Sequence, residues 1–266
     1  MSRSGQEATP HAHTATTAPD AAPVLGGATL ALATAGVVAA RTGVLSPPAL
    51  AFSALAWIVV CTAVVIGLRH HPHRLFGAAN AVTTLRALIA VALGAFAVEA
   101  GSGSLGDLAG PVGPGDLADP WLWCATLAAV IALALDGIDG PLARAAGLDS
   151  TFGARYDMEI DALLAFVLAA LIWRTGELGI WILALGTMRY AFLAAARVVP
   201  ALNAPLYSSF RRKAVCVVQI AALCAIVSPL VRQPLAIAIG AGATGALGWS
   251  FARDTLWLLR QARERA

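Results

Sequence analysis

The stretch Leu135–Ala162, L-D-G-I-D-G-P-L-A-R-A-A-G-L-D-S-T-F-G-A-R-Y-D-M-E-I-D-A, joins two apolar segments through a polar connection. It contains two pairs of aspartates, Asp136 with Asp139 and Asp157 with Asp161. The members of a pair are three or four residues apart, so in a helix they share one face. Ionisable residues at membrane depth are costly and usually mark function. Two such helices joined as a hairpin would bring the four carboxylates together.

This acidic stretch predicts a metal site. Four carboxylates gathered at one point repel one another, and a divalent cation relieves that repulsion. Because every donor is an oxygen atom, Mg²⁺ or Mn²⁺ is the expected ion. Gly137, Gly140 and Pro141 are expected to loosen the helix between the two pairs, and Arg144 can neutralise a phosphate. The alternative, helix-end charges in the headgroup zone, explains one aspartate more readily than four.

The composition indicates a chain that lies in lipid. Of the 266 residues, 59% are hydrophobic and 12% are charged, whereas soluble domains carry about 25% charged residues. The net charge of +3 is small, so we expect no nucleic-acid partner. Residues 1–22 are polar and predict a disordered tail. The richness in Ala and Arg favours a bacterial source, and therefore a cytoplasmic (inner) membrane.

Eight apolar segments approach the roughly 20 residues that a helix needs to cross a bilayer. The predicted fold is therefore an all-α, polytopic integral membrane protein of about eight transmembrane helices. The expected spans are Pro23–Ala40, Pro48–Leu68, Ala78–Val98, Trp121–Leu135, Met158–Trp173, Leu178–Val199, Ala214–Leu230 and Pro234–Leu258.

The positions of the basic residues predict the orientation, because Lys and Arg favour the cytoplasmic side of short loops. With eight spans, most of them fall on one side: Arg69, Arg74, Arg144, Arg155, Arg197, Arg211, Arg212, Lys213, Arg253, Arg260, Arg263 and Arg265. The other side receives Arg41, Arg174 and Arg232. Both termini and the aspartates are therefore expected at the cytoplasmic face.

The acidic stretch resembles the signature of the CDP-alcohol phosphatidyltransferases, D-x2-D-G-x2-A-R-(x)n-G-x3-D-x3-D. Its fixed positions are filled here by Asp136, Asp139, Gly140, Ala143, Arg144, Gly153, Asp157 and Asp161. Two weaker similarities are an N-x-x-T-x-x-R face formed by Asn80, Thr83 and Arg86, and a basic helix start at Arg211, Arg212 and Lys213 followed by Gln219. The family has a six-helix core. We therefore divide the chain into the tail, two extra N-terminal helices at 23–74, and a core at 75–266.

The resemblance implies a role for each matched residue. The implied metal ligands are Asp136, Asp139 and Asp157, with Asp161 near enough to help coordinate a second ion. The residues implied to line the cytidine and diphosphate site are Gly140, Ala143, Arg144 and Gly153. Asp161 is also implied to be the general base on the acceptor hydroxyl. The implied reaction moves a phosphatidyl-type group from a lipid such as CDP-diacylglycerol to an alcohol, releasing CMP, and family members are commonly homodimers.

The acceptor alcohol stays open at this stage. Arg155, Arg189 and Arg197 are candidates for binding it. Their alternative roles are pairing with Glu159 inside the membrane and reaching toward the headgroups. Two other functions compete with transfer: a transporter that uses the intramembrane aspartates for ions or protons, and a family member that only binds nucleotide. Neither explains the complete signature as directly.

Overall fold

The structure, a computed structural model, describes residues 21–69, 71, 73, 75–100, 120–148, 150–204 and 209–264. The side chains of Asp139, Pro141 and Ala143, within a described helix, lie outside that description. Residues 1–20 of the predicted polar tail lie outside the described residues, so the prediction of a disordered tail stays untested.

Within its described residues the chain is helical and contains no strand, which confirms the all-α prediction. The long helices are α1 (Ala22–Thr42), α2 (Pro47–Leu68), α3 (Gly77–Ala100), α5 (Pro120–Ala146), α6 (Thr151–Arg174), α7 (Leu183–Val198), α8 (Phe210–Val227) and α9 (Leu235–Glu264). Two short 3₁₀ helices, η1 (Ile180–Ile182) and η2 (Pro200–Asn203), flank α7. Each of the eight expected spans overlaps one long helix, with ends that differ by up to eleven residues.

Helix α5 is longer than expected, because it continues through the glycines and proline of the acidic stretch. The expectation of a loosened helix at Gly137, Gly140 and Pro141 is therefore wrong. Pro141 removes one main-chain donor, and any proline inside a helix crowds the carbonyl of the residue four positions earlier. That residue is Gly137, whose backbone is the most adaptable of any residue. The uninterrupted helix keeps Asp136 and Arg144 on one rigid element.

Six of the described segments are long and apolar enough to cross a membrane, so the chain is an integral membrane protein. They are Ala22–Thr42, Pro47–Leu68, Gly77–Ala100, Pro120–Ile138, Ile180–Val198 and Leu235–Glu264. Helices α6 and α8 are long enough but carry more charge: α6 holds Asp157, Glu159 and Asp161, and α8 begins with three basic residues. Membrane crossing by these two helices remains a prediction.

The helices pack around two main hydrophobic clusters, and a third, small cluster joins α7, η2 and α9. The larger joins α3, α5, α6, α7, α8 and α9, and fully buried leucines of α6 such as Leu164 and Leu168 lie within it. The smaller main cluster joins α1, α2, α3 and the first half of α6. Helices α3 and α6 belong to both main clusters, so the two halves of the bundle meet on these two helices.

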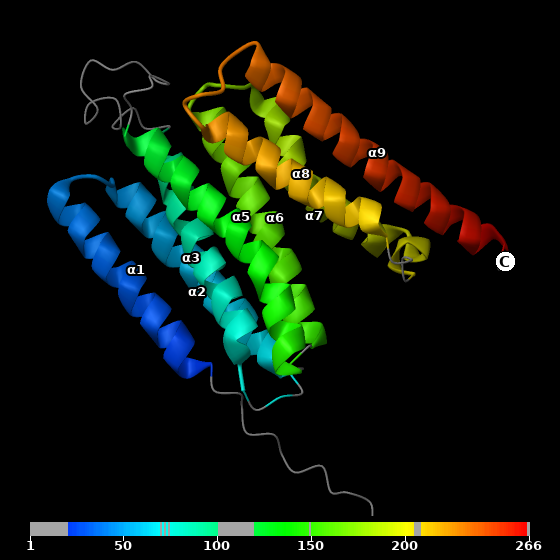
Figure 1. The fold of residues 1–266 in the computed structure, drawn as a ribbon, viewed down its shortest axis with the longest axis horizontal. Coiled ribbons are helices and arrows are strands. Elements are labelled where there is room, and N and C mark those ends of the chain that lie inside the picture. Colours follow the sequence, from blue (N-terminus) through cyan, green and yellow to red (C-terminus); the bar gives the residue numbers. More distant parts are fainter. Residues whose placement is uncertain are drawn as a thin grey trace, which may run out of the picture.

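The acidic stretch lies at one end of the bundle. The C-terminal ends of α2 and α5 and the N-terminal ends of α3 and α6 lie together there (Figure 1). Helix α1 forms one outer edge of the molecule, and α9 forms the opposite edge (Figure 1).

Candidate active site

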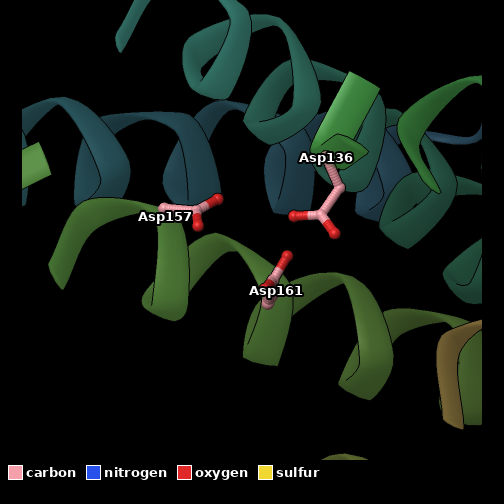
Figure 2. Close-up of side chains that lie close together, drawn as sticks. All are labelled: Asp136, Asp157 and Asp161. Atoms are coloured by element: carbon pink, nitrogen blue, oxygen red, sulfur yellow. The ribbon is translucent and has the colours of Figure 1, made fainter. Parts of the chain in front are cut away.

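Three carboxylates from two helices form the centre of the site. Asp136 comes from α5, and Asp157 and Asp161 come from successive turns of α6. One oxygen from each lies within 4.8 Å of the others, and all three side chains are partly exposed. Figure 2 shows the three carboxylates directed into the space between the helices. We call these three residues the aspartate cluster.

Asp139 follows Asp136 on α5, but its side chain lies outside the described residues. The structure therefore brings together three of the four aspartates that the sequence singled out. Their oxygen-only donor set suits a hard divalent cation such as Mg²⁺ or Mn²⁺.

Arg86 of α3 lies between these carboxylates. Its side chain is fully buried and forms ion pairs with all three members of the aspartate cluster, at 2.9 Å in the case of Asp136. With the carboxylates ionised, the three acids and the one guanidinium carry a formal charge of −2. Such a surplus is costly away from water. A divalent cation would balance it, so the charge as well as the donor atoms fits the expected ion.

The polar face of α3 continues from Arg86 toward the end of the bundle. Thr83 and Asn80 on this face are buried, and Asn80 Nδ2 donates a hydrogen bond to the Phe76 carbonyl at 2.5 Å. A β-carbon placed on Gly153 of α6 would lie 3.0 Å from Asn80 Oδ1. Glycine at this position therefore lets α6 approach α3, a packing reason that the sequence did not reveal.

The other residues expected at the nucleotide site lie at the end of α5. Arg144 is exposed, and its Nη1 lies 3.4 Å from the point where a β-carbon on Gly140 would stand. Ala143 is on the same helix, with its side chain outside the described residues. Gly153 lies in the first turn of the facing helix, where its N–H donates to Ser150 Oγ at 3.0 Å. The structure thus gathers these positions at the end of the bundle that holds the aspartate cluster.

A cavity of about 110 Å³ adjoins the cluster between α6, α7, α8 and α9. Its polar lining includes Asp161, Arg189 and Gln219, together with Cys216. Arg189 Nη2 lies 2.5 Å from Glu159 Oε1, which is the pairing that the sequence left open. Arg155 and Arg197 are exposed and are not among the cavity's lining residues. Of the three candidate acceptor residues, only Arg189 thus shares a cavity with Asp161.

The basic start of α8 has a different environment. Arg211 Nη2 lies 2.5 Å from Asp254 Oδ1, and Arg211 Nη1 donates to Ser250 Oγ at 2.6 Å. Arg212 Nη1 lies 3.7 Å from the other oxygen of Asp254. Asp254 is buried in α9. We call these four residues the α8–α9 clamp, because they join the two helices.

Arg86 is the site residue whose role the sequence did not assign. The sequence did offer one indication of this role. A guanidinium inside an apolar helix is energetically costly, so an acidic partner is expected for it. Cys216 and Gln219 at the cavity had no comparable signal, because a cysteine or a glutamine in an apolar helix is an ordinary core residue.

Fold and site together define an integral membrane protein with a carboxylate-rich centre between α3, α5 and α6. A sequence model of the CDP-alcohol phosphatidyltransferase family matches residues 76–250, which is more than half of the chain, and the chain belongs to this family. The match begins after α2, so α1 and α2 are additional N-terminal helices. Comparisons with curated proteins and with solved structures gave no match.

Membership confirms the family predicted from the acidic stretch. The family's reaction is phosphotransfer from a CDP-linked alcohol, and divalent metal is general in the family. No finding supports the transporter alternative.

Proposed function

We propose that the protein transfers a phosphatidyl group from a CDP-linked lipid such as CDP-diacylglycerol to an alcohol acceptor, with release of CMP, in phospholipid biosynthesis. The observation that carries this proposal is the aspartate cluster, three carboxylates within 4.8 Å of one another beside a fully buried arginine. A transporter needs the charges but not the phosphate-binding signature that surrounds them.

The proposed metal ligands are Asp136, Asp139, Asp157 and Asp161, and the ion is Mg²⁺ or Mn²⁺. When bound, the ion would neutralise charge on the diphosphate and so make CMP a better leaving group. Arg86 holds the cluster's carboxylates together from α3 through its ion pairs. It limits their mutual repulsion and thereby keeps α5 and α6 in position.

The proposed donor site is the end of α5 and the start of α6. Arg144 is exposed there and can bind a diphosphate oxygen through charge-assisted hydrogen bonds. Gly140 and Ala143 present little side-chain bulk beside it, which leaves room for the cytidine. Gly153 is proposed to contribute to this site through its backbone at the start of α6. The lipid tails stay in the bilayer while the headgroup enters between the helices.

Asp161 is the proposed general base because it belongs to the cluster and also lines the neighbouring cavity. Its carboxylate takes the proton of the acceptor hydroxyl, and the acceptor oxygen forms a bond to the phosphorus nearer the lipid. The bond from that phosphorus to the oxygen shared with the cytidine-bearing phosphate breaks, and CMP leaves with its electron pair. General-base assistance of this kind is worth about 10²–10⁴ in rate.

The cavity beside Asp161 is the proposed route of the acceptor, with Arg189 on its wall. Arg189 is therefore the first candidate for a phosphate or other anionic group on the acceptor, and Arg155 and Arg197 lie further out. We also propose that the site opens to the cytoplasm, that the membrane is the bacterial inner membrane, and that the protein is a homodimer.

The test is an assay of the full chain in liposomes with labelled CDP-diacylglycerol, Mg²⁺ and a panel of acceptors: glycerol phosphate, inositol phosphate, serine, choline and phosphatidylglycerol. We expect one acceptor to give a lipid product together with CMP, and Asp161→Asn to give neither. Absence of CMP with every acceptor, combined with cation flux into the liposomes, would favour the transporter instead.

A further inference from the structure

Helix α2, the second of the two N-terminal helices outside the family match, packs against the helix that carries two of the candidate metal ligands. Trp57, Val60 and Val64 of α2 lie in one buried cluster with Phe152 and Tyr156 of α6. These residues of α2 recur every three or four positions, so they form a single stripe along that helix. The hairpin of α1 and α2 therefore contacts α6 as well as lipid.

The closest approach is at the end of α2. A β-carbon on Gly67 would lie 2.6 Å from Cε2 and 2.8 Å from Cδ2 of the Phe152 ring. Any residue larger than glycine at this position must therefore displace the ring or move α6. Gly67 is therefore the point of close packing between the added hairpin and α6, and Gly94 of α3, where a β-carbon would lie 2.5 Å from Cε1 of Phe52, is the corresponding point between α2 and α3.

The Phe152 ring has little freedom to move aside. It is 6% exposed, and the buried His71 ring meets it edge-on with centroids 5.3 Å apart. His71 is itself held, since its Nε2 donates to the Leu75 carbonyl at 3.1 Å. On the other side Phe152 stacks on Tyr156 at 5.8 Å. A displaced ring would therefore push on α6 rather than swing into open space.

Tyr156 links Phe152 to the part of α6 that bears the candidate metal ligands. Its hydroxyl donates to Thr84 Oγ1 of α3 at 3.2 Å, and the next residue in the chain is Asp157. Phe152, Tyr156 and Ile160 form one face of α6, and Asp157 and Asp161 begin about 100° further round the same helix. The rotation of α6 about its axis thus fixes both faces together.

We infer that the α1–α2 hairpin is a positioning element for the active site: through Gly67 and Phe152 it sets the rotation of α6 and hence the placement of Asp157 and Asp161. Side-chain ends lie about 5–6 Å from a helix axis, so a rotation of about 10° moves them by about 1 Å. Displacements of this size can lower a catalytic rate about 10²-fold. A hairpin that served as a membrane anchor alone would need no close approach to α6.

The inference rests on the proposed metal centre, and the test separates the two. Mn²⁺ is titrated into the full-length chain in detergent, and free Mn²⁺ is followed by electron paramagnetic resonance. Wild-type protein should bind Mn²⁺; if it does not, the metal centre is wrong whatever the hairpin does. Gly67→Ala should weaken binding about tenfold, the lower end of the effect of residues that orient metal ligands.

The matched control is Gly27→Ala on α1, where an added β-carbon meets nothing within 4 Å. Both changes replace a helical glycine by alanine, and the difference in environment that bears on α6 is the contact of position 67 with Phe152. Gly27→Ala should bind Mn²⁺ as wild type does. Equal affinities of Gly67→Ala and Gly27→Ala would overturn the inference.

The second part of the test asks whether a further substitution restores the Mn²⁺ affinity. Phe152→Leu shortens the ring that an alanine at position 67 would strike, so the double variant should recover much of the Mn²⁺ affinity lost by Gly67→Ala. Should Gly67→Ala fail to fold, the single variant Phe152→Leu tests the inference. It loosens the contact between position 67 and the Phe152 ring, so it should weaken Mn²⁺ binding in folded protein. Unchanged affinity in that variant, or no rescue in the double variant, contradicts the positioning role.

Discussion

Two groups of charged side chains in this protein contain the same kinds of residue in opposite proportion. In the aspartate cluster, three carboxylates meet the single guanidinium of Arg86. In the α8–α9 clamp, two arginines meet the single carboxylate of Asp254. The clamp matches its one buried carboxylate within the protein, whereas the cluster keeps a surplus of negative charge. The balance between acidic and basic side chains, more than their burial, therefore distinguishes a candidate ion site from a structural contact between helices.

The largest effects are expected from the cluster's own carboxylates, and they should differ by position. Asp136→Asn should lose both CDP-diacylglycerol binding and transfer, because it removes a proposed link between protein and diphosphate. Asp161→Asn should lower transfer about 10²–10⁴-fold because the proton acceptor is lost. Donor binding should largely survive, because Asp136, Asp139 and Asp157 remain as proposed metal ligands. Thermal shift with CDP-diacylglycerol and Mg²⁺ measures binding, and CMP release measures transfer. Near wild-type turnover by Asp161→Asn would show that another residue is the general base, and Glu159 is the next candidate.

The two arginines test the comparison directly. Arg86→Gln should lower the melting temperature in chelator, since breaking a buried ion pair costs about 3–5 kcal/mol. It should also increase the stabilisation gained from Mg²⁺, because the carboxylates then lack their internal counter-charge. Arg211→Gln should lower the melting temperature equally with and without Mg²⁺. If the two variants respond to Mg²⁺ in the same way, the distinction between cluster and clamp fails.

A smaller effect is expected at the wall of the cavity. Arg189→Gln should raise the KM for an anionic acceptor more than the KM for CDP-diacylglycerol, because Arg189 lines the cavity beside Asp161. Arg197→Gln is the control, since Arg197 is exposed and is not among the lining residues. Steady-state kinetics with each substrate varied in turn gives both constants. Equal changes in the two KM values would assign Arg189 a structural role through its pair with Glu159.

Much of this fold could be predicted from local sequence. Apolar segments of membrane length gave every long helix, and the spacing of the aspartates gave the two faces that meet. The partner of Arg86 could not be predicted in the same way. Helical periodicity places Arg86 on a face with Asn80 and Thr83, but it does not say which helix that face meets.

Two other features could be recognised only from the three-dimensional packing of the helices. Gly153 looked like space for a ligand, and its close neighbour is Asn80 of α3. Gly67 carried no signal at all, because a glycine near a helix end is common and Phe152 is 85 positions further along the chain. Contacts of this range depend on the packing of whole helices, which residue spacing within one helix does not encode.

The central claim is that the aspartate cluster works with a divalent cation in transfer from a CDP-linked lipid. The most direct measurement is CMP release from CDP-diacylglycerol by the full chain, with its best acceptor, first in EDTA and then during readdition of Mg²⁺ or Mn²⁺. We predict no CMP above background in EDTA, recovery on readdition, and weaker recovery in Asp139→Asn. Full activity in chelator would contradict the account.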